Sequence, residues 1–188
     1  ISATSVLKDI RDNYLKDEII ILTSNKYKQF FIDSHLVNKI LVDDRKGLIA
    51  SIYFISKILK MDINLVINLQ NSRRTTIYEL FFRLFTSATI NGTGIFSTSR
   101  YKLNLGNLPS VIEGLSNQIE LLDIKCRRKP YLDWLNNHSF DFNKIDHQRL
   151  LIINPGCSRK NIQKKWPSEK YAEICKVLIS KNILPILI

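Results

Sequence analysis

The stretch RLLIINPGCSRKNIQKKW, residues 149–166, indicates the fold of this chain most clearly. Its apolar residues 150–154 predict a buried strand, which ends at a Pro-Gly pair and leads through a basic loop to a helix after Pro167. A strand followed by a glycine turn, a hydroxyl group and lysines commonly holds phosphate, because backbone N–H groups, Ser158 and cations converge on one anion. The spacing is equally typical of an ordinary strand-to-helix connection with exposed lysines, so both interpretations stay open here.

Helices and strands alternate on both sides of this stretch. The strand expected at 19–22 is a continuous apolar run, which is typical of a strand buried on both faces of a parallel sheet, and the next buried strand is expected at 65–69. The other expected strands are 40–42, 89–95 and 183–188, and the expected helices are 3–14, 26–32, 48–59, 77–85, 109–122 and 168–181. We therefore predict an α/β fold, with a first domain at 1–124, a linker at 125–148 and the start of a second domain at 149–188.

A second candidate site follows the strand at 65–69. The turn at 70–76 carries two arginines and two threonines at the start of a helix, and ligands of open α/β sheets bind beyond the carboxyl ends of the strands. Arginines are unfavourable at a helix N-terminus, which prefers anions, and an anionic ligand would remove that conflict. The alternative, that Arg73 and Arg74 point into water, carries equal weight on these residues alone.

The composition describes a basic globular chain. Its 188 residues are 45% hydrophobic and 24% charged, with a formal net charge of +11. That charge favours polyanions, namely nucleic acid, an anionic membrane face or phosphorylated small molecules, without choosing among them. We interpret the cluster at 127–129 as a solvated face, and His138 and His147 as surface residues. Runs of 18 apolar residues are missing, which argues against a transmembrane helix and favours a soluble or peripheral protein.

The cysteines and the two ends add further expectations. Cys126, Cys157 and Cys175 lie far apart and match neither a zinc site nor a disulfide framework, which suits a reducing cytoplasm. The chain starts at Ile1 without methionine and stops inside an apolar run, so we expect residues beyond both ends, and a signal peptide cannot be judged.

Several acidic and aromatic residues receive structural interpretations. We interpret Asp9 and Asp12 as surface charges on the first helix, and the Asp43-Asp44 pair as a surface strand end that lacks the DxD spacing of a metal site. The aromatic residues of the apolar helical segments are expected in the core: Tyr53, Phe54, Phe81, Phe82 and Phe85.

Three stretches together resemble glycosyltransferase family 9, whose heptosyltransferases transfer heptose from ADP-heptose to the lipopolysaccharide core. They are INLQNSRRT at 67–75, INPGCSRKNIQKKWPSEKYAEI at 153–174 and ISATSVLKDI at 1–10. The second is the most specific, because it is similar to the family's PG-(x)n-KxWP-x-x-x-(F/Y)-AEL signature. Ser5, where the family usually has proline, and Cys157, where alanine or threonine is common, depart from the pattern and leave the sugar open.

The resemblance implies a GT-B fold of two Rossmann-like domains with parallel sheets, the first lacking its first strand and the second truncated. It implies that the second domain binds the donor diphosphate through Gly156, Cys157, Ser158 and Lys164. It implies that the first domain binds the acceptor through Ser72, Arg73, Arg74 and Thr75. The catalytic aspartate base is expected in a Gly-Asp turn upstream of Ile1, so the catalytic residue within the chain stays unknown. Neither a metal nor another cofactor is expected.

The implied activity is inverting transfer of a heptose or related sugar from a nucleotide-diphosphate sugar, ADP-heptose, to the phosphorylated lipopolysaccharide core. The implied location is the cytoplasm, peripheral to the cytoplasmic face of the inner membrane, without nucleic acid as a partner, and the fragment itself is expected to be inactive. Two alternatives remain: a basic α/β nucleic-acid-binding protein, which should interleave exposed aromatic and basic residues, and a non-catalytic family member.

Overall fold

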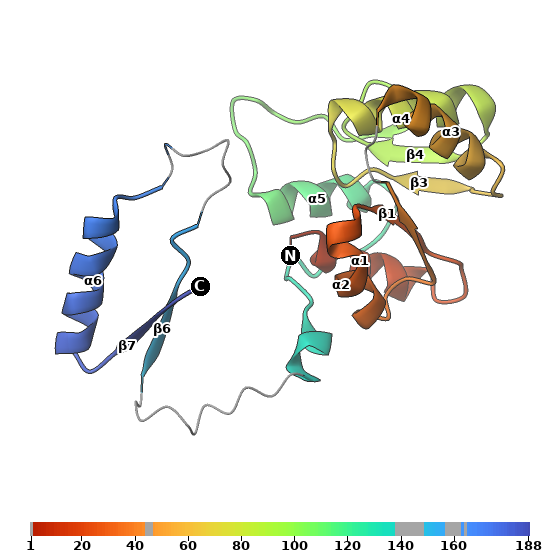
Figure 1. Ribbon diagram of the computed structural model, residues 1–188. Coiled ribbons are helices and arrows are strands. Elements are labelled where there is room, and N and C mark those ends of the chain that lie inside the picture. The colour runs from red at the N-terminus through yellow and green to blue at the C-terminus, as the bar shows by residue number, and fades with distance from the viewer. Residues whose placement is uncertain (1, 44–46, 138–148, 157–162, 164) are drawn as a thin grey trace. The chain divides into compact units, whose positions relative to one another are not determined.

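A computed structural model describes residues 2–43, 47–137, 149–156, 163 and 165–188 (Figure 1). By its contacts the chain divides into two compact units, Ile1–Asn137 and His138–Ile188. The predicted α/β class with parallel sheets is confirmed, because every strand pair in the described residues is parallel. Each unit is described by itself below.

The strands of the first unit form two parallel sheets. β1 (Ile20–Thr23) pairs with β2 (Lys39–Val42), and β3 (Leu65–Ile67), β4 (Thr89–Gly92) and β5 (Ser99–Arg100) form the second sheet in that order. The expectation that residues 19–22 are buried on both faces is wrong, since Leu22 is 38% exposed. The reason is that β1 pairs only with β2 among the described strands, so its other edge has no neighbouring strand.

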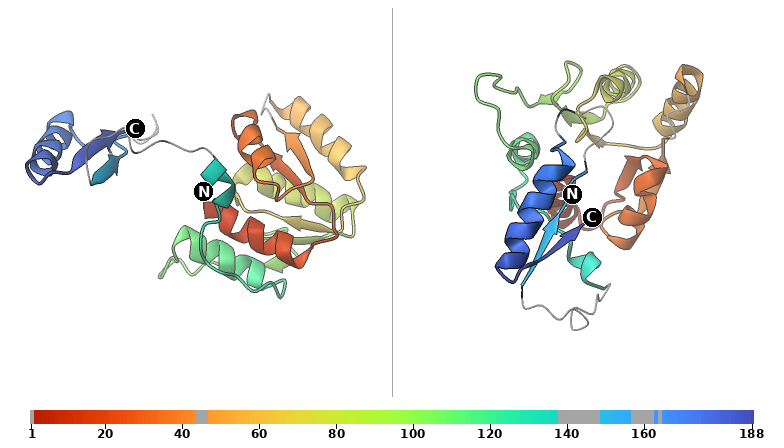
Figure 2. Two further views of the ribbon diagram at one scale, coloured as in Figure 1. Left: turned by 90° about the horizontal axis from the view of Figure 1, so that it is seen from below. Right: turned by 60° about the vertical axis from the view of Figure 1, so that its left-hand side comes forward.

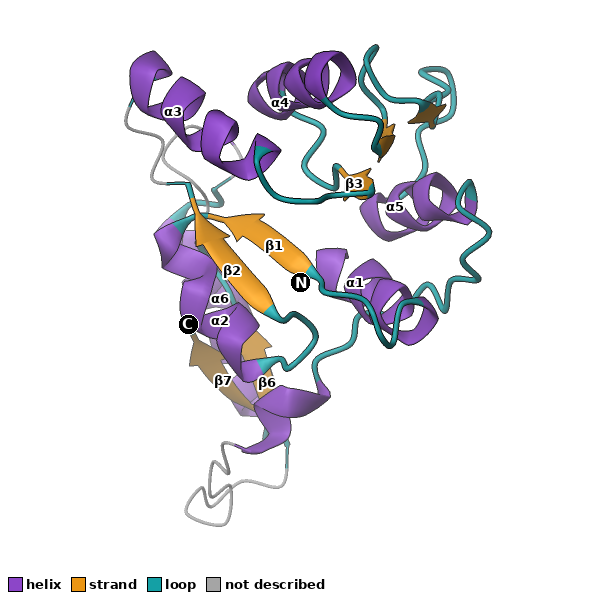
Figure 3. Ribbon diagram, turned by 90° about the vertical axis from the view of Figure 1, so that its right-hand side faces the viewer, coloured by secondary structure: helices purple, strands orange, loops and turns teal. Residues whose placement is uncertain are grey.

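The helices of the first unit lie around these strands (Figure 3), and two apolar clusters join them to the sheets. α1 (Ser2–Asn13) and α5 (Val111–Glu120) bury Val6 and Ile119 in one cluster, together with Ile67 of β3 and with Ile19, the residue before β1. α3 (Leu48–Leu59) and α4 (Arg73–Phe85) bury Ile55 and Phe82 in the other. The short helices η1 (Asn25–Tyr27) and α2 (Lys28–Asp33) replace the single helix expected at 26–32. Each of these clusters thus joins β3 to the first sheet, through β2 in one cluster and through the residue before β1 in the other.

The prediction for the aromatic residues is correct in part. Phe82 is buried, and Phe54 and Phe81 pack against the same cluster. Tyr53 and Phe85 are exposed, so the expectation that they belong to the core is wrong. Tyr53 lies on the side of α3 opposite the buried Ile55, and Phe85 is the last residue of α4, where the packing around Phe82 ends.

The segment after α5 packs against the first unit. The short helix η2 (Asp133–Asn137) buries Trp134 beside Leu7 and Leu36, and the ring of Trp134 meets Phe30 edge-on at 5.4 Å. Contacts therefore place residues 125–137, which we assigned to the linker, in the first unit. Residues 138–148, the rest of the expected linker with its two histidines, lie outside the described residues.

The interpretation of Asp9 as a surface charge is wrong. Its side chain is 2% exposed, and Oδ2 accepts the backbone N–H of Arg127 at 3.1 Å while Oδ1 pairs with the Arg127 guanidinium at 3.1 Å. Arg127 also pairs with Asp12, and Arg128 pairs with Glu120 at 2.9 Å. The basic cluster at 127–129 is therefore partly committed to ion pairs that hold this segment on α1 and α5.

The thiol of Cys126, in the same segment, is expected to react slowly with alkylating reagents. Burial raises the pKa of its thiol from 9.0 to about 11, and the negative charges of Glu120 and Asp9 add to the effect. Only the thiolate reacts, so alkylation by iodoacetamide near neutral pH should be about 100-fold slower than for an unperturbed thiol. Mass spectrometry of the peptide containing Cys126 after timed alkylation measures this rate, and a rate equal to that of a model peptide would contradict the expectation.

The second unit is a strand, a helix and a strand (Figure 2). β6 (Leu150–Ile153) and β7 (Leu184–Leu187) pair in parallel, and α6 (Ser168–Ser180) packs against β7. The expected burial of residues 150–154 is wrong, because Ile152 is 63% exposed where one helix and two strands cannot cover both faces. Ser168, expected to cap α6, lies inside the helix, and Pro167 occupies the cap position.

None of the helices in the described residues has the length and apolar character needed to span a membrane.

Candidate functional site

The turn at the carboxyl end of β3 starts α4 with a capping box. The Ser72 hydroxyl accepts the Thr75 backbone N–H at 3.4 Å, and Thr75 Oγ1 accepts the Ser72 backbone N–H at 2.8 Å. Because these side chains satisfy free donors of the first turn, α4 begins at Arg73, four residues before the expected start at residue 77. Two of the four predicted acceptor-binding residues, Ser72 and Thr75, thus have a structural role at the helix N-terminus.

Arg74 joins three other polar side chains. Its Nη1 lies 3.3 Å from Asp43 Oδ2, its Nη2 donates to Ser51 Oγ at 3.3 Å, and the Tyr78 hydroxyl donates to Asp43 Oδ2 at 2.9 Å. Asp43 is 13% exposed, so the interpretation of this residue as a surface charge is wrong. Arg74 is half-buried, whereas Arg73 is exposed as the alternative interpretation expected. An anion that binds Arg74 would compete with the Asp43 carboxylate for the same guanidinium.

Tyr78 should lose its proton only at unusually high pH. Burial raises its pKa above the ordinary 10.0, and the hydrogen bond to Asp43 raises it further. Folding favours the neutral phenol, so the stability that this bond contributes is complete below the unfolded pKa and is lost as pH rises through the higher folded pKa.

A spectroscopic pH titration of the tyrosines measures this shift. The wild-type protein should show one late ionisation phase, and Tyr78→Phe should abolish it. The control Tyr53→Phe, at an exposed tyrosine, should leave the late phase in place. A late phase that survives Tyr78→Phe would assign it to another residue.

A network of buried amide side chains supports the turn at 70–76. Asn71 has a left-handed backbone with φ of 48°, and its side chain donates to Gln118 Oε1 at 2.9 Å. The Gln118 amide donates to Asn91 Oδ1 at 3.0 Å and to the backbone carbonyl of Asn68 at 3.1 Å. These bonds connect the ends of β3 and β4 to α5, so they fix the loop that presents Arg73 and Arg74. Sequence reasoning missed them, although asparagines directly at strand ends offered a signal.

Glu79 is a buried carboxylate next to this network. It is 1% exposed, and its Oε1 accepts the Asn68 amide at 2.5 Å. Within the described residues its Oε2 has no hydrogen-bond partner. Gly92 and Gly94 lie against it so closely that an added Cβ would stand 2.6 Å and 2.1 Å from its oxygens. The carboxylate packed against them thus requires glycine both at the end of β4, at Gly92, and in the turn that follows, at Gly94.

The predicted donor loop is only partly described. Gly156 is exposed, and its N–H donates to Asn154 Oδ1 at 2.9 Å. Cys157, Ser158 and Lys164 lie outside the described residues. Beyond the loop, the exposed Trp166 ring lies 5.8 Å from that of Tyr171. Diphosphate binding by these residues therefore stays a prediction.

The described parts of the chain contain no group of three or more His, Cys, Asp or Glu side chains placed to hold a metal ion.

Comparison with known proteins supports the fold. Neither a family model nor a curated protein matches the sequence. Among solved structures, the chain is similar to the glycosyl transferase family 9 protein from Veillonella parvula DSM 2008, at a TM-score of 0.68 and 18% identity over 99% of this chain and 57% of that one. The chain has the fold of glycosyl transferase family 9.

Two Escherichia coli structures agree with this family fold. The ADP-heptose lps heptosyltransferase II matches at a TM-score of 0.63 and 15% identity, over 99% of this chain and 59% of its own. The heptosyltransferase WaaC with ADP matches at a TM-score of 0.65 and 12% identity, over 99% of this chain and 62% of its own. The chain therefore spans about three fifths of the length of these three proteins. The predicted GT-B class and the resemblance to family 9 are confirmed at the level of the fold.

Proposed function

We propose that the full-length protein is an inverting glycosyltransferase that moves a heptose or related sugar from ADP-heptose to the phosphorylated lipopolysaccharide core. The observation that carries this proposal is the family 9 fold over 99% of the chain, combined with a basic helix N-terminus at the carboxyl end of β3. Such strand ends are where open α/β sheets bind their ligands. Fold likeness alone gives only analogy for activity, and two sets of residues support the proposal beside it.

Arg73 and Arg74 support the acceptor part of the proposal. Both guanidinium groups belong to the first turn of α4, where backbone N–H groups also favour an anion. Arg74 is already oriented by Asp43 and Ser51, which lowers the entropy lost when a phosphate or carboxylate binds it. We assign these residues to an acidic group of the acceptor, with Ser72 and Thr75 holding the turn.

The donor part rests on residues 153–174, with Gly156, Cys157, Ser158 and Lys164 as contacts of the diphosphate. The Lys164 ammonium would stabilise the charge that builds on the leaving ADP, which is electrostatic catalysis by a preorganised donor. No metal or other cofactor is part of this mechanism. The general base is the aspartate that the resemblance places directly before the first helix.

Lys164→Ala in the full-length enzyme should lower turnover of the ADP-sugar about 100-fold, as loss of one such donor does in other enzymes. Release of ADP from ADP-heptose, measured with purified lipopolysaccharide core as acceptor, gives the rate. The neighbouring Lys165→Ala is the matched control and should change the rate little. Unchanged kinetics in Lys164→Ala would remove this lysine from the mechanism.

The same assay decides the wider proposal. ADP-heptose consumption that depends on the core acceptor supports it, and transfer from a different nucleotide sugar would correct the donor. A protein that binds ADP and transfers nothing would be the non-catalytic alternative. We also propose that the protein acts at the cytoplasmic face of the inner membrane, because a lipid-linked acceptor resides there. Cosedimentation of the full-length protein with anionic lipid vesicles tests that contact.

Nucleic-acid binding is not favoured. Arg127 and Arg128 each pair with a carboxylate, which reduces the free positive charge that a phosphate backbone needs. A steep salt-dependent affinity for DNA in a protein without affinity for ADP would reverse this conclusion.

A further inference from the structure

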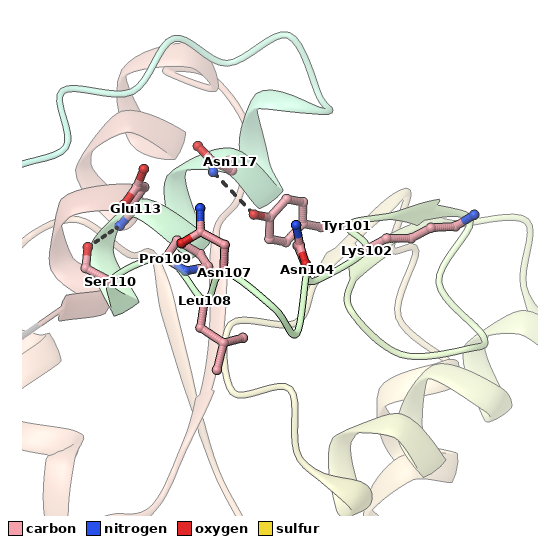
Figure 4. Close-up of a pocket in the computed structure, with 9 residues that line it drawn as sticks. All are labelled: Tyr101, Lys102, Asn104, Asn107, Leu108, Pro109, Ser110, Glu113 and Asn117. Carbon is pink, nitrogen blue, oxygen red and sulfur yellow. Dashed lines mark hydrogen bonds between the residues drawn. The ribbon is translucent and has the colours of Figure 1, made fainter.

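A polar hollow of about 320 Å³ lies beyond β5 (Figure 4). One side is the loop from Tyr101 to Pro109, and the other is the first two turns of α5, with Glu113 and Asn117. Its volume falls at the lower end of the range for small-molecule pockets. None of the four predicted acceptor-binding residues belongs to it.

The walls of the hollow are held by local hydrogen bonds. Asn117 donates to the Tyr101 hydroxyl at 3.3 Å and fixes its ring across the hollow (Figure 4). Asn104 Oδ1 accepts the Gly106 backbone N–H at 3.0 Å and closes the turn of the loop. Ser110 caps α5 by accepting the Glu113 backbone N–H at 3.3 Å. The loop is therefore already organised without a ligand, which lowers the entropy lost on binding.

The chemistry of the lining favours a neutral, hydroxyl-rich ligand. In a chain of net charge +11, the hollow combines one lysine, Lys102, with one glutamate. That glutamate, Glu113, lies in the first turn of α5 and repels an anion from the helix N-terminus. Asparagine amides and hydroxyls supply donors and acceptors for sugar hydroxyls, while Leu108, 62% exposed, offers an apolar surface for C–H groups.

The location connects the hollow to the turn at 70–76. β3, β4 and β5 are parallel, so the loop after β5 and the turn after β3 leave the same edge of one sheet. We propose that the hollow binds a neutral sugar unit of the acceptor, beside the acidic group assigned to Arg73 and Arg74. The assignment to the acceptor rests on the proposed function, whereas the preference for a neutral saccharide rests on the hollow itself.

The affinity for one sugar unit should be weak. A monosaccharide has about a dozen non-hydrogen atoms, and at about 0.3 kcal/mol per atom the expected Kd is of the order of 1 mM. Weak binding at this level calls for a residue-resolved measurement, because bulk methods cannot separate it from non-specific contact.

The test is an amide chemical-shift titration of the isotope-labelled full-length protein with methyl α-mannopyranoside. We expect saturable shifts in residues 101–117 and at least a tenfold weaker Kd in Asn107→Leu, which removes an exposed amide of the lining. Asn25→Leu is the matched control, at an exposed asparagine outside the hollow, and should bind as the wild type does. Inorganic phosphate should leave residues 101–117 unshifted.

Two outcomes overturn the proposal. One is the absence of saturable shifts in residues 101–117 up to tens of millimolar glycoside, and the other is a stronger response there to phosphate than to the glycoside. The proposed function is tested separately. Glycoside binding without sugar transfer would support the subsite and contradict the transferase role. Sugar transfer without glycoside binding would support the transferase role and contradict the subsite. In a working enzyme, Asn107→Leu should raise the acceptor KM and leave kcat unchanged.

Discussion

Replacing Gly94 with alanine is expected to lower the free energy of unfolding by about 3 kcal/mol or more, near the upper end for an overpacked core. The new Cβ would stand 2.1 Å from Glu79 Oε2 and 3.0 Å from its carboxyl carbon. Glu79 is 1% exposed, and its other oxygen is bonded to Asn68, so the carboxylate cannot swing away into water. Either the turn after β4 or helix α4 must shift.

Urea unfolding of the full-length protein, followed by circular dichroism and by exchange of the β4 amide protons, measures this loss. Gly106→Ala is the matched control, because its Cβ meets only the Asn104 side chain, at 3.4 Å, on an exposed loop. Combining Gly94→Ala with Glu79→Ser should recover part of the loss, since the clashing atoms are then gone. Equal stabilities of Gly94→Ala and Gly106→Ala would show that the carboxylate moves freely.

Gln118→Leu is expected to lower the free energy of unfolding by about 3–5 kcal/mol. Several buried polar groups lose their hydrogen-bond partner at once, and each such loss costs about 1–3 kcal/mol. Gln118 is 1% exposed and bonds to Asn71, Asn91 and the Asn68 carbonyl. Leucine fills a similar volume but can neither donate nor accept. The loss should appear in the same unfolding experiments, and Gln29→Leu, at an exposed glutamine, should change stability by less than about 0.5 kcal/mol.

The same substitution connects packing to the proposed activity. Without Gln118, the left-handed Asn71 loses the side-chain bond that holds the turn before Arg73 and Arg74. We therefore expect a higher acceptor KM in any Gln118→Leu protein that still folds, with donor affinity unchanged. A stable variant with wild-type acceptor kinetics would show that the network supports the fold without positioning the turn.

The amino-acid sequence alone was enough for the order and type of the main elements. The predicted helix at 48–59 has the observed bounds, because its apolar positions repeat with the helical period and that period depends only on local residues. The resemblance of residues 67–75 and 153–174 to family 9 likewise predicted the observed fold. The roles assigned to Gly156, Cys157, Ser158 and Lys164 stay predictions.

Which charged side chains are buried depends on the tertiary packing. Asp9 and Asp43 occur in polar stretches typical of a surface, yet residues 118 and 31 positions away in sequence, Arg127 and Arg74, pair with them. The burial of Glu79 is a further example, since it depends on the absence of side chains at Gly92 and Gly94. Burial and ion pairing depend on segments distant in sequence, so local periodicity carries no signal for them. Local pattern thus determined the helices and strands, and long-range packing determined the site.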